Sequence, residues 1–182
     1  MRDRRAFQNA RRAREFEAFV AGAAGRLLHA ATLLTAEPPN VNPRARRLLT
    51  LTLAHTYASW DRLRGEDPYD RARQQLAVRF ARGAWHQYGA LGRSRPSPSP
   101  SPSPSPSPSP SGSGSVAVLA RLTPQERLIL VLRMYEGVAE EQTAALLGLP
   151  VERVRAICAR AMTTLLHPPR GPAPTMAKVV PS

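Results

Sequence analysis

A run of eight Pro-Ser dipeptides, residues 96–111, most constrains the fold of this 182-residue chain. Proline at every second position fixes φ and removes backbone donors, so the run is excluded from helix and sheet interiors. We expect polyproline II, in which the run could extend to roughly 50 Å at about 3.1 Å per residue. The strict alternation offers no apolar or basic anchor for an SH3-type domain, so residues 93–115 are interpreted as a disordered linker.

The linker predicts two small units rather than one large domain. Residues 15–92 and 116–166 carry helical periodicity and no strand alternation, so the fold class expected is all-α, with two small helical domains. Neither unit can bury a large core. Residues 167–182 are rich in proline and lack periodicity, which predicts a disordered tail. A tether of this kind holds both units on one target while letting them sit far apart.

The second unit contains a pattern typical of a helix-turn-helix. Its helix start is marked by the capping box of Thr123 and Glu126, with Pro124 at the first helical position. Further on, a short amphipathic helix ends at Gly148, and Pro150 permits a second helix to begin. The second helix has an apolar series made up of Val151, Val154, Cys158, Ala161, Met162 and Leu165.

The polar side of that second helix carries Arg153, Arg155 and Arg160. In a DNA-binding helix-turn-helix, the second helix lies in the major groove and its early residues face the base edges. An equally simple interpretation is a helical hairpin in any small bundle, with arginines on a solvated face. The pattern alone leaves both interpretations open.

The first unit is predicted to hold three helices. Apolar residues from Phe16 to Leu34 keep the helical period. Asn42 and Pro43 indicate an N-cap and the start of a helix to about Leu63, and Asp67 with Pro68 repeats the signal for a third. Residues 1–14, with six arginines, are expected to form a solvated basic arm or a frayed first turn, with contact to DNA or polymerase as the alternative.

The third helix combines basic and aromatic residues. Arg79, Arg82 and Tyr88 could meet phosphates and stack on unpaired bases of single-stranded nucleic acid. The alternative is that Trp85 and Tyr88 close the bundle and the arginines are simply solvated. We favour the structural role for Trp85 and leave both roles open for Tyr88.

The charge of the chain favours a polyanionic partner. The formal net charge is +13, and Lys178 is the single lysine among 26 basic residues. Guanidinium groups match phosphate and carboxylate bidentately, so nucleic acid is the leading partner class, although a coding bias toward arginine would give the same count.

Other residue types argue against several classes of protein. Cys158 is the single cysteine, which excludes an intrachain disulfide and fits a reducing cytosol. The most apolar stretch, residues 20–34, is interrupted by Arg26 and His29, so we expect a soluble, cytoplasmic protein without membrane insertion. The four histidines are scattered, and no metal-ligand spacing or phosphate-binding loop is present, which predicts no metal, no cofactor and no enzymatic activity.

The segment LTPQERLILVLRMYEGVAEEQTAALLGLPVERVRAICARAMTTLL closely resembles region four of the extracytoplasmic-function (ECF) group of bacterial sigma-70 family factors. TAALLG and the residues before it make the resemblance specific, and it is strongest to the actinobacterial SigE-like group. EFEAFVAGAAGRLLHAATLLT with LTLAHTYASWDRLRGEDPYDRAR is similar to region two of the same group. Together the two segments cover nearly the whole chain except the arm, linker and tail.

The resemblance implies a dissociable subunit of bacterial RNA polymerase. In the family, region two docks on the polymerase clamp helices and captures the downstream promoter element. Region four grips the polymerase flap and reads the upstream element. The implied partners are core RNA polymerase, promoter DNA and an anti-sigma factor. The implied upstream-reading residues are Arg153, Arg155, Ile157 and Arg160, and the downstream candidates are Arg79, Arg82 and Tyr88.

Two departures from the family bear on these expectations. The family has an acidic pair and a glutamine at the start of the second region-two helix, where this chain has Arg46, Arg47 and Thr50 around Leu48. These four residues are the implied polymerase-binding set, and the reversed charge motivates an alternative function, a sigma-like regulator or adapter that has lost normal polymerase docking. In region four, Ile157 stands where an amide is usual, and Ala139 replaces the usual serine cap.

Overall fold

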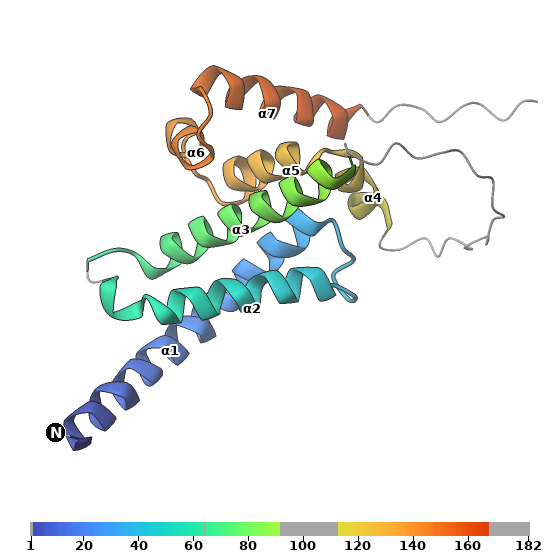
Figure 1. Ribbon diagram of the computed structural model, residues 1–182. Helices are drawn as coiled ribbons and strands as arrows, with labels where there is room; N and C mark the ends of the chain where they lie inside the picture. Colours follow the sequence, from blue (N-terminus) through green and yellow to red (C-terminus); the bar gives the residue numbers. More distant parts are fainter. Residues whose placement is uncertain (1, 64, 92–112, 168–182) are drawn as a thin grey trace, which may run out of the picture.

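A computed structural model describes residues 2–63, 65–91 and 113–167, and every regular element in those residues is helical, as expected (Figure 1). The first unit holds α1 (Arg2–Thr35), α2 (Pro43–Ala58), the 3₁₀ turn η1 (Trp60–Arg62) and α3 (Pro68–Leu91). The second unit holds α4 (Ser113–Arg121), α5 (Pro124–Leu130), the π-helical turn η2 (Val131–Tyr135), α6 (Glu140–Leu147) and α7 (Val151–Leu166). Most of the expected linker lies outside the described residues, as does the tail, but α4 begins inside the range assigned to the linker.

The first unit is built on α1, which packs against α2 and α3. The helix begins at Arg2, so the expected arm is largely a helical extension. Arginine, alanine and glutamate favour helix, which explains the extension. Arg12 ties this segment to the next helix through an ion pair with Asp61 (3.2 Å) and through its guanidinium, 4.3 Å from the centre of the Tyr57 ring.

One part of α1, Ala6–Thr35, is long and apolar enough to cross a membrane by length and composition alone. In the structure, the apolar face of this segment supplies core residues. Ala23, Leu27, Ala31 and Leu34 are each at most 6% exposed and pack against residues of the other helices. Part of the apolar character of this segment therefore serves the packing of the core.

The start of α2 is capped differently from the expectation. The Asn42 side chain caps no backbone N–H, because its amide nitrogen donates to Thr32 and Pro39 and its oxygen accepts from Arg46. Glu37 takes this role, since its carboxylate accepts from the backbone N–H groups of Arg44 (3.1 Å) and Ala45 (2.8 Å). A carboxylate here also compensates the helix dipole that the nearby arginines oppose.

The second unit follows its sequence signals closely. The expected capping box is present, with Thr123 accepting from the Glu126 backbone N–H and Glu126 accepting from that of Thr123. After α5 the chain widens into η2, where the Glu136 N–H donates to the Val131 carbonyl. Gly137, at φ +68°, then turns the chain toward α6.

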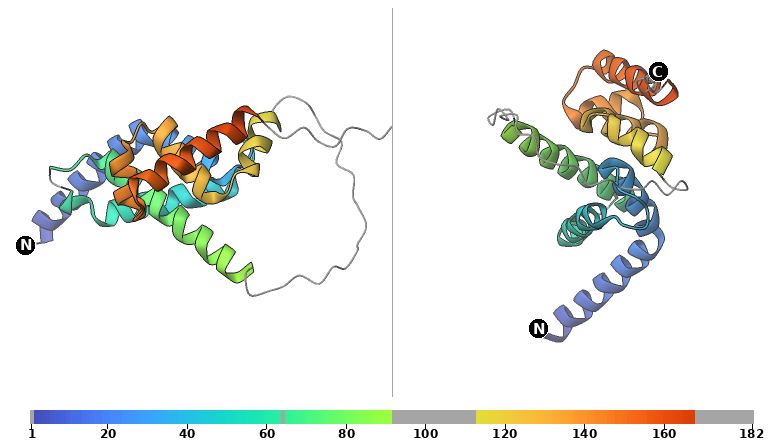
Figure 2. Two further views of the ribbon diagram at one scale, coloured as in Figure 1. Left: turned by 90° about the horizontal axis from the view of Figure 1, so that it is seen from above. Right: turned by 90° about the vertical axis from the view of Figure 1, so that its right-hand side faces the viewer.

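The two units share one hydrophobic core. Ala30, Ala31 and Leu34 of α1 and Leu76, Ala77 and Phe80 of α3 lie in the same buried cluster as Leu128, Val131, Leu132 and Val138 of the second unit. The views from two further sides show α5 between α7 and the first unit (Figure 2). The units are therefore in direct contact, with α7 on the far side of α5.

Candidate nucleic-acid interface

The hairpin of α6 and α7 has the geometry that the sequence predicts. Gly148 adopts the left-handed conformation (φ +65°), its N–H donates to Ala145 (3.4 Å), and the next N–H, of Leu149, donates to Ala144 (3.0 Å). This is a helix C-cap that favours glycine, because a side chain at positive φ is strained. Pro150 precedes the first turn of α7 in an extended conformation. A tight turn therefore fixes α7 relative to α6.

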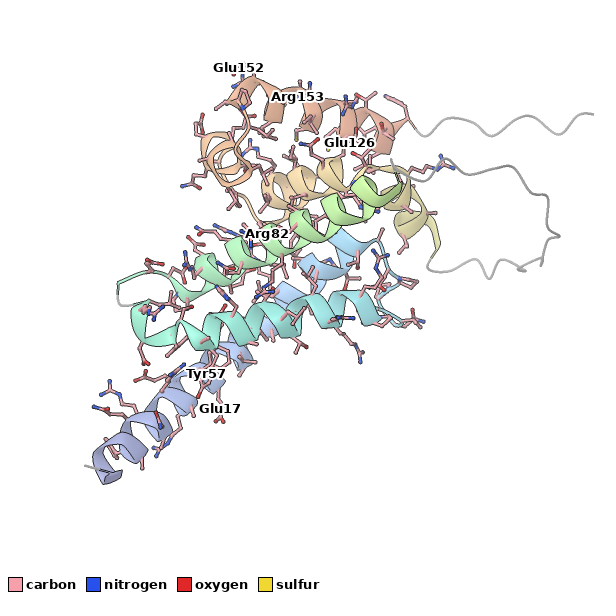
Figure 3. All side chains as sticks on the ribbon, viewed as in Figure 1. Glu17, Tyr57, Arg82, Glu126, Glu152 and Arg153 are labelled. Carbon is pink, nitrogen blue, oxygen red and sulfur yellow. The ribbon has the colours of Figure 1, made fainter. Side chains whose placement is uncertain are left out.

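The outer face of α7 is basic. Glu152 and Arg153 lie at the start of the helix and point away from the rest of the molecule (Figure 3). Arg155 and Arg160 follow, and each side chain is 62% exposed. The face is thus accessible to a polyanion along its length.

Two glutamates hold these arginines in place. Arg155 donates to Oε2 of Glu140 from Nη2 (2.9 Å) and Nε (3.2 Å). Arg160 donates from Nε to Oε1 of Glu126 (2.8 Å). Neither pair is predictable from the sequence: the local pattern marks Glu126 only as a capping residue, and no sequence signal joins it to a residue 34 positions away.

The Glu126 carboxylate is the most constrained charge on this face. Burial alone would raise its pKa, but the hydrogen bonds from the Thr123 backbone, from Arg160 and from the Thr123 hydroxyl outweigh that effect and lower it. Glu126 therefore stays ionised at neutral pH. It joins the helix cap of α5 to the basic face of α7.

A second basic surface lies between α2, α3 and α5. A groove of about 600 Å³ is lined by Arg44, Arg47 and Arg79 around Leu48, Leu51 and Phe80. We call this the basic groove. The Nε atom of Arg79 is buried and lacks a hydrogen-bond partner among the described residues, and Leu51 is 44% exposed. Charge and apolar surface therefore coincide at this site.

The structure brings only part of the implied polymerase-binding set into the basic groove. Arg47 and Leu48 line it, whereas the Arg46 guanidinium donates to Asn42 (2.9 Å). The Thr50 hydroxyl donates to the Arg46 carbonyl (2.9 Å). Of the downstream candidates, Arg79 lines the groove, Arg82 is exposed on α3 (Figure 3), and the side chain of Tyr88 lies outside the described residues.

A comparison with protein families matches residues 118–167 to the family described as Sigma-70, region 4. The match spans α5, η2 and the whole α6–α7 hairpin, together with the C-terminal part of α4. Residues 118–167 are thus similar to a sigma-70 region 4 domain, and we refer to them as the region 4 domain. The α6–α7 hairpin lies within the matched residues, and in a DNA-binding helix-turn-helix the second helix, here α7, is the recognition helix.

A solved structure has a fold similar to that of this chain. The sigma factor RpoE from Bartonella quintana, crystallised in complex with the anti-sigma factor NepR, is similar with a TM-score of 0.54 and 18% sequence identity. The alignment covers 86% of this chain and 99% of that one, so the similarity extends over both helical units. A comparison with curated proteins finds no match.

Ile157 does not belong to the exposed face of the region 4 domain, which corrects the expectation. Its side chain is 2% exposed and packs with Ile129, Ala144 and Val154 in the core of the domain. An apolar side chain is stable there because it is removed from water. The exposed residues among the four predicted on α7 are therefore Arg153, Arg155 and Arg160.

Two other positions singled out in the sequence, Cys158 and Ala139, lie away from the basic face of the region 4 domain. Burial raises the pKa of the Cys158 thiol, which packs between two apolar clusters, as expected of a core residue. Ala139 occupies the N-cap of α6 without a side-chain hydrogen bond. The described residues contain no group of three or more histidine, cysteine, aspartate or glutamate side chains placed to hold a metal ion.

Proposed function

We propose that this chain is an ECF-type sigma factor, which binds core RNA polymerase and directs promoter-specific initiation through its region 4 domain. The observation that carries the proposal is the region 4 match over a helix-turn-helix whose recognition helix presents exposed arginines. The likeness in fold to a sigma factor over both units supports a region-two role for α1 to α3. Sigma factors are initiation factors and not enzymes, so the chain acts by binding.

The proposed contacts divide between the units. Arg153, Arg155 and Arg160 contact the upstream promoter element, and Arg79, Arg82 and Tyr88 contact the downstream element. Arg46, Arg47, Leu48 and Thr50 face the polymerase clamp. The location is the cytoplasm, with nucleoid association when the protein is bound to polymerase.

An anti-sigma factor is a further proposed partner. The similar sigma factor from Bartonella quintana was crystallised with one, which supports such a partner for this fold. Within the ECF group, the residues of the region-four segment favour the actinobacterial SigE-like group.

A second candidate function is a sigma-like regulator or adapter that has lost normal polymerase docking. The basic groove favours it, because Arg47, which stands at one of the two positions where the family carries acidic residues, lies in the groove with Arg44 and Arg79. Like charges brought together at an interface cost several kcal/mol. A groove of this character accepts an acidic partner more readily than a basic one.

Co-purification with bacterial core RNA polymerase tests the proposal. The full chain competes with a housekeeping sigma factor at fixed moderate salt, and recovery of a stoichiometric complex is the expected result. A folded protein that is not retained would contradict the sigma-factor proposal and favour the regulator.

Two charge variants then test whether the reversed charge at Arg46 and Arg47 is what prevents polymerase docking. In Arg46→Glu/Arg47→Asp, acids return to the positions where the family has them. The matched control Arg62→Glu/Arg121→Asp makes the same charge change at exposed positions elsewhere. If reversed charge prevents docking, only the first variant gains polymerase binding; equal behaviour of the two variants would exclude that cause.

A further inference from the structure

A buried carboxylate joins the two units. Glu136 follows η2 in the region 4 domain, and its side chain is 1% exposed. Its partners among the described residues belong to the first unit. The Tyr69 hydroxyl lies 3.0 Å from each carboxylate oxygen, and Oε2 also lies 3.4 Å from Nη2 of Arg26 and 4.0 Å from Nη1 of Arg73.

Aromatic rings enclose this ion cluster. The Arg26 guanidinium lies 5.2 Å from the centre of the Tyr69 ring and 5.8 Å from that of Tyr135. The Tyr135 ring also contacts His29 of α1, with centres 5.0 Å apart. Burial, followed by the hydrogen bond to Glu136, raises the pKa of Tyr69, so its hydroxyl stays a donor at physiological pH. The cluster is therefore made by residues of α1, α3 and η2 together.

A buried carboxylate makes the contact specific. Apolar surfaces attract in many arrangements, whereas an ionised group removed from water is tolerated only where its partners are in place. Glu136 has these partners only when the units are in contact. If the units separate, water molecules take the place of these partners around the Glu136 carboxylate.

We infer that Glu136 is an intramolecular latch, which holds the region 4 domain against the first unit in one defined arrangement. The recognition helix is not covered in this closed state. α7 packs on α5 and α6, and Arg155 and Arg160 stay exposed. The latch therefore sets the separation of the two units and leaves the recognition helix accessible. If the region 4 domain must separate from the first unit before both promoter elements can be contacted, the latch is regulatory. This step rests on the proposed function.

Removal of one partner tests the latch. In Arg26→Met the apolar stem is retained and the charge is lost, which leaves Glu136 poorly compensated while buried. Small-angle X-ray scattering of the full chain at fixed moderate salt measures the shape. We expect a compact wild type and an increase in radius of gyration for Arg26→Met. The maximum dimension should grow by up to roughly 50 Å, the extended length of the Pro-Ser run.

A compensating variant distinguishes a latch from general damage. Adding Glu136→Leu to Arg26→Met removes the uncompensated charge and offers apolar surface instead, which is often neutral or stabilising at a buried site. We expect the double variant to return to the compact form. Arg62→Met, an exposed arginine of η1, is the matched control and should scatter like the wild type.

Three outcomes would overturn the latch: an extended wild type, an unchanged Arg26→Met, or an equal expansion of Arg62→Met. Circular dichroism establishes that each variant is folded. If Arg26→Met fails to fold, Tyr69→Phe removes one hydrogen bond to Glu136 with little change in volume and must also expand the protein. Failure of the polymerase co-purification would remove the proposed function and leave this scattering result standing.

Discussion

At the scale of single residues, two of the three arginines proposed to contact DNA are positioned by carboxylates. Arg155 must give up its two hydrogen bonds to Glu140 before its guanidinium can contact a base or phosphate. Arg160 is held by a glutamate that also caps α5. Arg153 has no ion pair among the described residues. The three arginines thus differ in the hydrogen bonds that each must break before it can bind DNA.

Arg155→Ala should weaken binding to a duplex selected by the protein. We expect a loss of about 1–3 kcal/mol if Arg155 reads a guanine, or a decrease of about one in the salt slope if it contacts phosphate. Fluorescence anisotropy over a series of salt concentrations separates the two. Arg62→Ala, with the same charge change in the first unit, is the control, and an unaltered affinity and slope for Arg155→Ala would remove this residue from the interface.

Glu126 should make the stability of the region 4 domain depend on pH. Its folded pKa is lowered, so its contribution is complete above its unfolded pKa, about 4.3, and is lost as pH falls through the folded pKa. Glu126→Gln should lower the free energy of unfolding at pH 7 by about 1 kcal/mol. The difference should shrink toward pH 3.

Thermal unfolding from pH 7 to pH 3 measures this effect. Glu141→Gln, on an exposed side chain of α6, is the control and should follow the wild type. A gap between wild type and Glu126→Gln that stays constant over the whole range would contradict the assigned role of the charge.

At the scale of elements, helix ends account for much of the local structure. α5 has a complete capping box, α2 takes its cap from Glu37 in the preceding loop, and α6 begins at Ala139 without a side-chain cap. The start of α6 is therefore the one of these three that lacks a side-chain cap. It is also the start of the helix that supports recognition helix α7.

Ala139→Ser should stabilise the region 4 domain by about 1 kcal/mol, because a serine hydroxyl can accept from the free N–H groups of the first turn of α6. The extended backbone of Ala139 (φ −61°, ψ 155°) already suits an N-cap. Chemical denaturation gives the free energy of unfolding. Ala145→Ser, exposed within α6, is the control and should be neutral or slightly destabilising; equal gains from both variants would rule out capping as the cause.

The sequence predicted those elements whose signals are local. Thr123 with Glu126 and Gly148 with Pro150 each act within a few residues, so the capping box and the hairpin follow directly from the pattern. Ile157 was interpreted from family resemblance, although it lies three residues after Val154 and four before Ala161, a spacing that itself indicates burial. The Glu37 cap involves a residue seven or eight positions before its donors, which an N-cap pattern does not include.

At the scale of the whole molecule, the contact between the units could not be predicted from the sequence. Leu128 and Leu132 have the spacing of ordinary core residues, and periodicity does not tell which helix will cover them. The partners of Glu136 lie 63 or more positions away in the chain. Packing between units depends on the complementarity of two surfaces. Helical periodicity identifies the apolar face of each helix but does not predict which other face it contacts.

Release of the region 4 domain should not change its intrinsic DNA binding. Because α7 faces away from the first unit, the expanded Arg26→Met variant and wild type should bind a duplex carrying only the upstream element with dissociation constants equal within about twofold. Anisotropy titration at one salt concentration measures this. A tenfold tighter binding by the expanded Arg26→Met variant would show that the closed state masks α7 after all.

The π-helical turn η2 determines the direction in which Glu136 points, and so contributes to the contact between the two units. Five residues, Val131–Tyr135, occupy a turn wider than an α-helical one. With α5 held by its core, a regular α-helix over the same residues would carry Glu136 about 100° further around the axis. The carboxylate would then leave the side that faces Tyr69. The extra residue that η2 accommodates after Leu130 therefore sets the direction of the Glu136 side chain, and with it the contact between the two units.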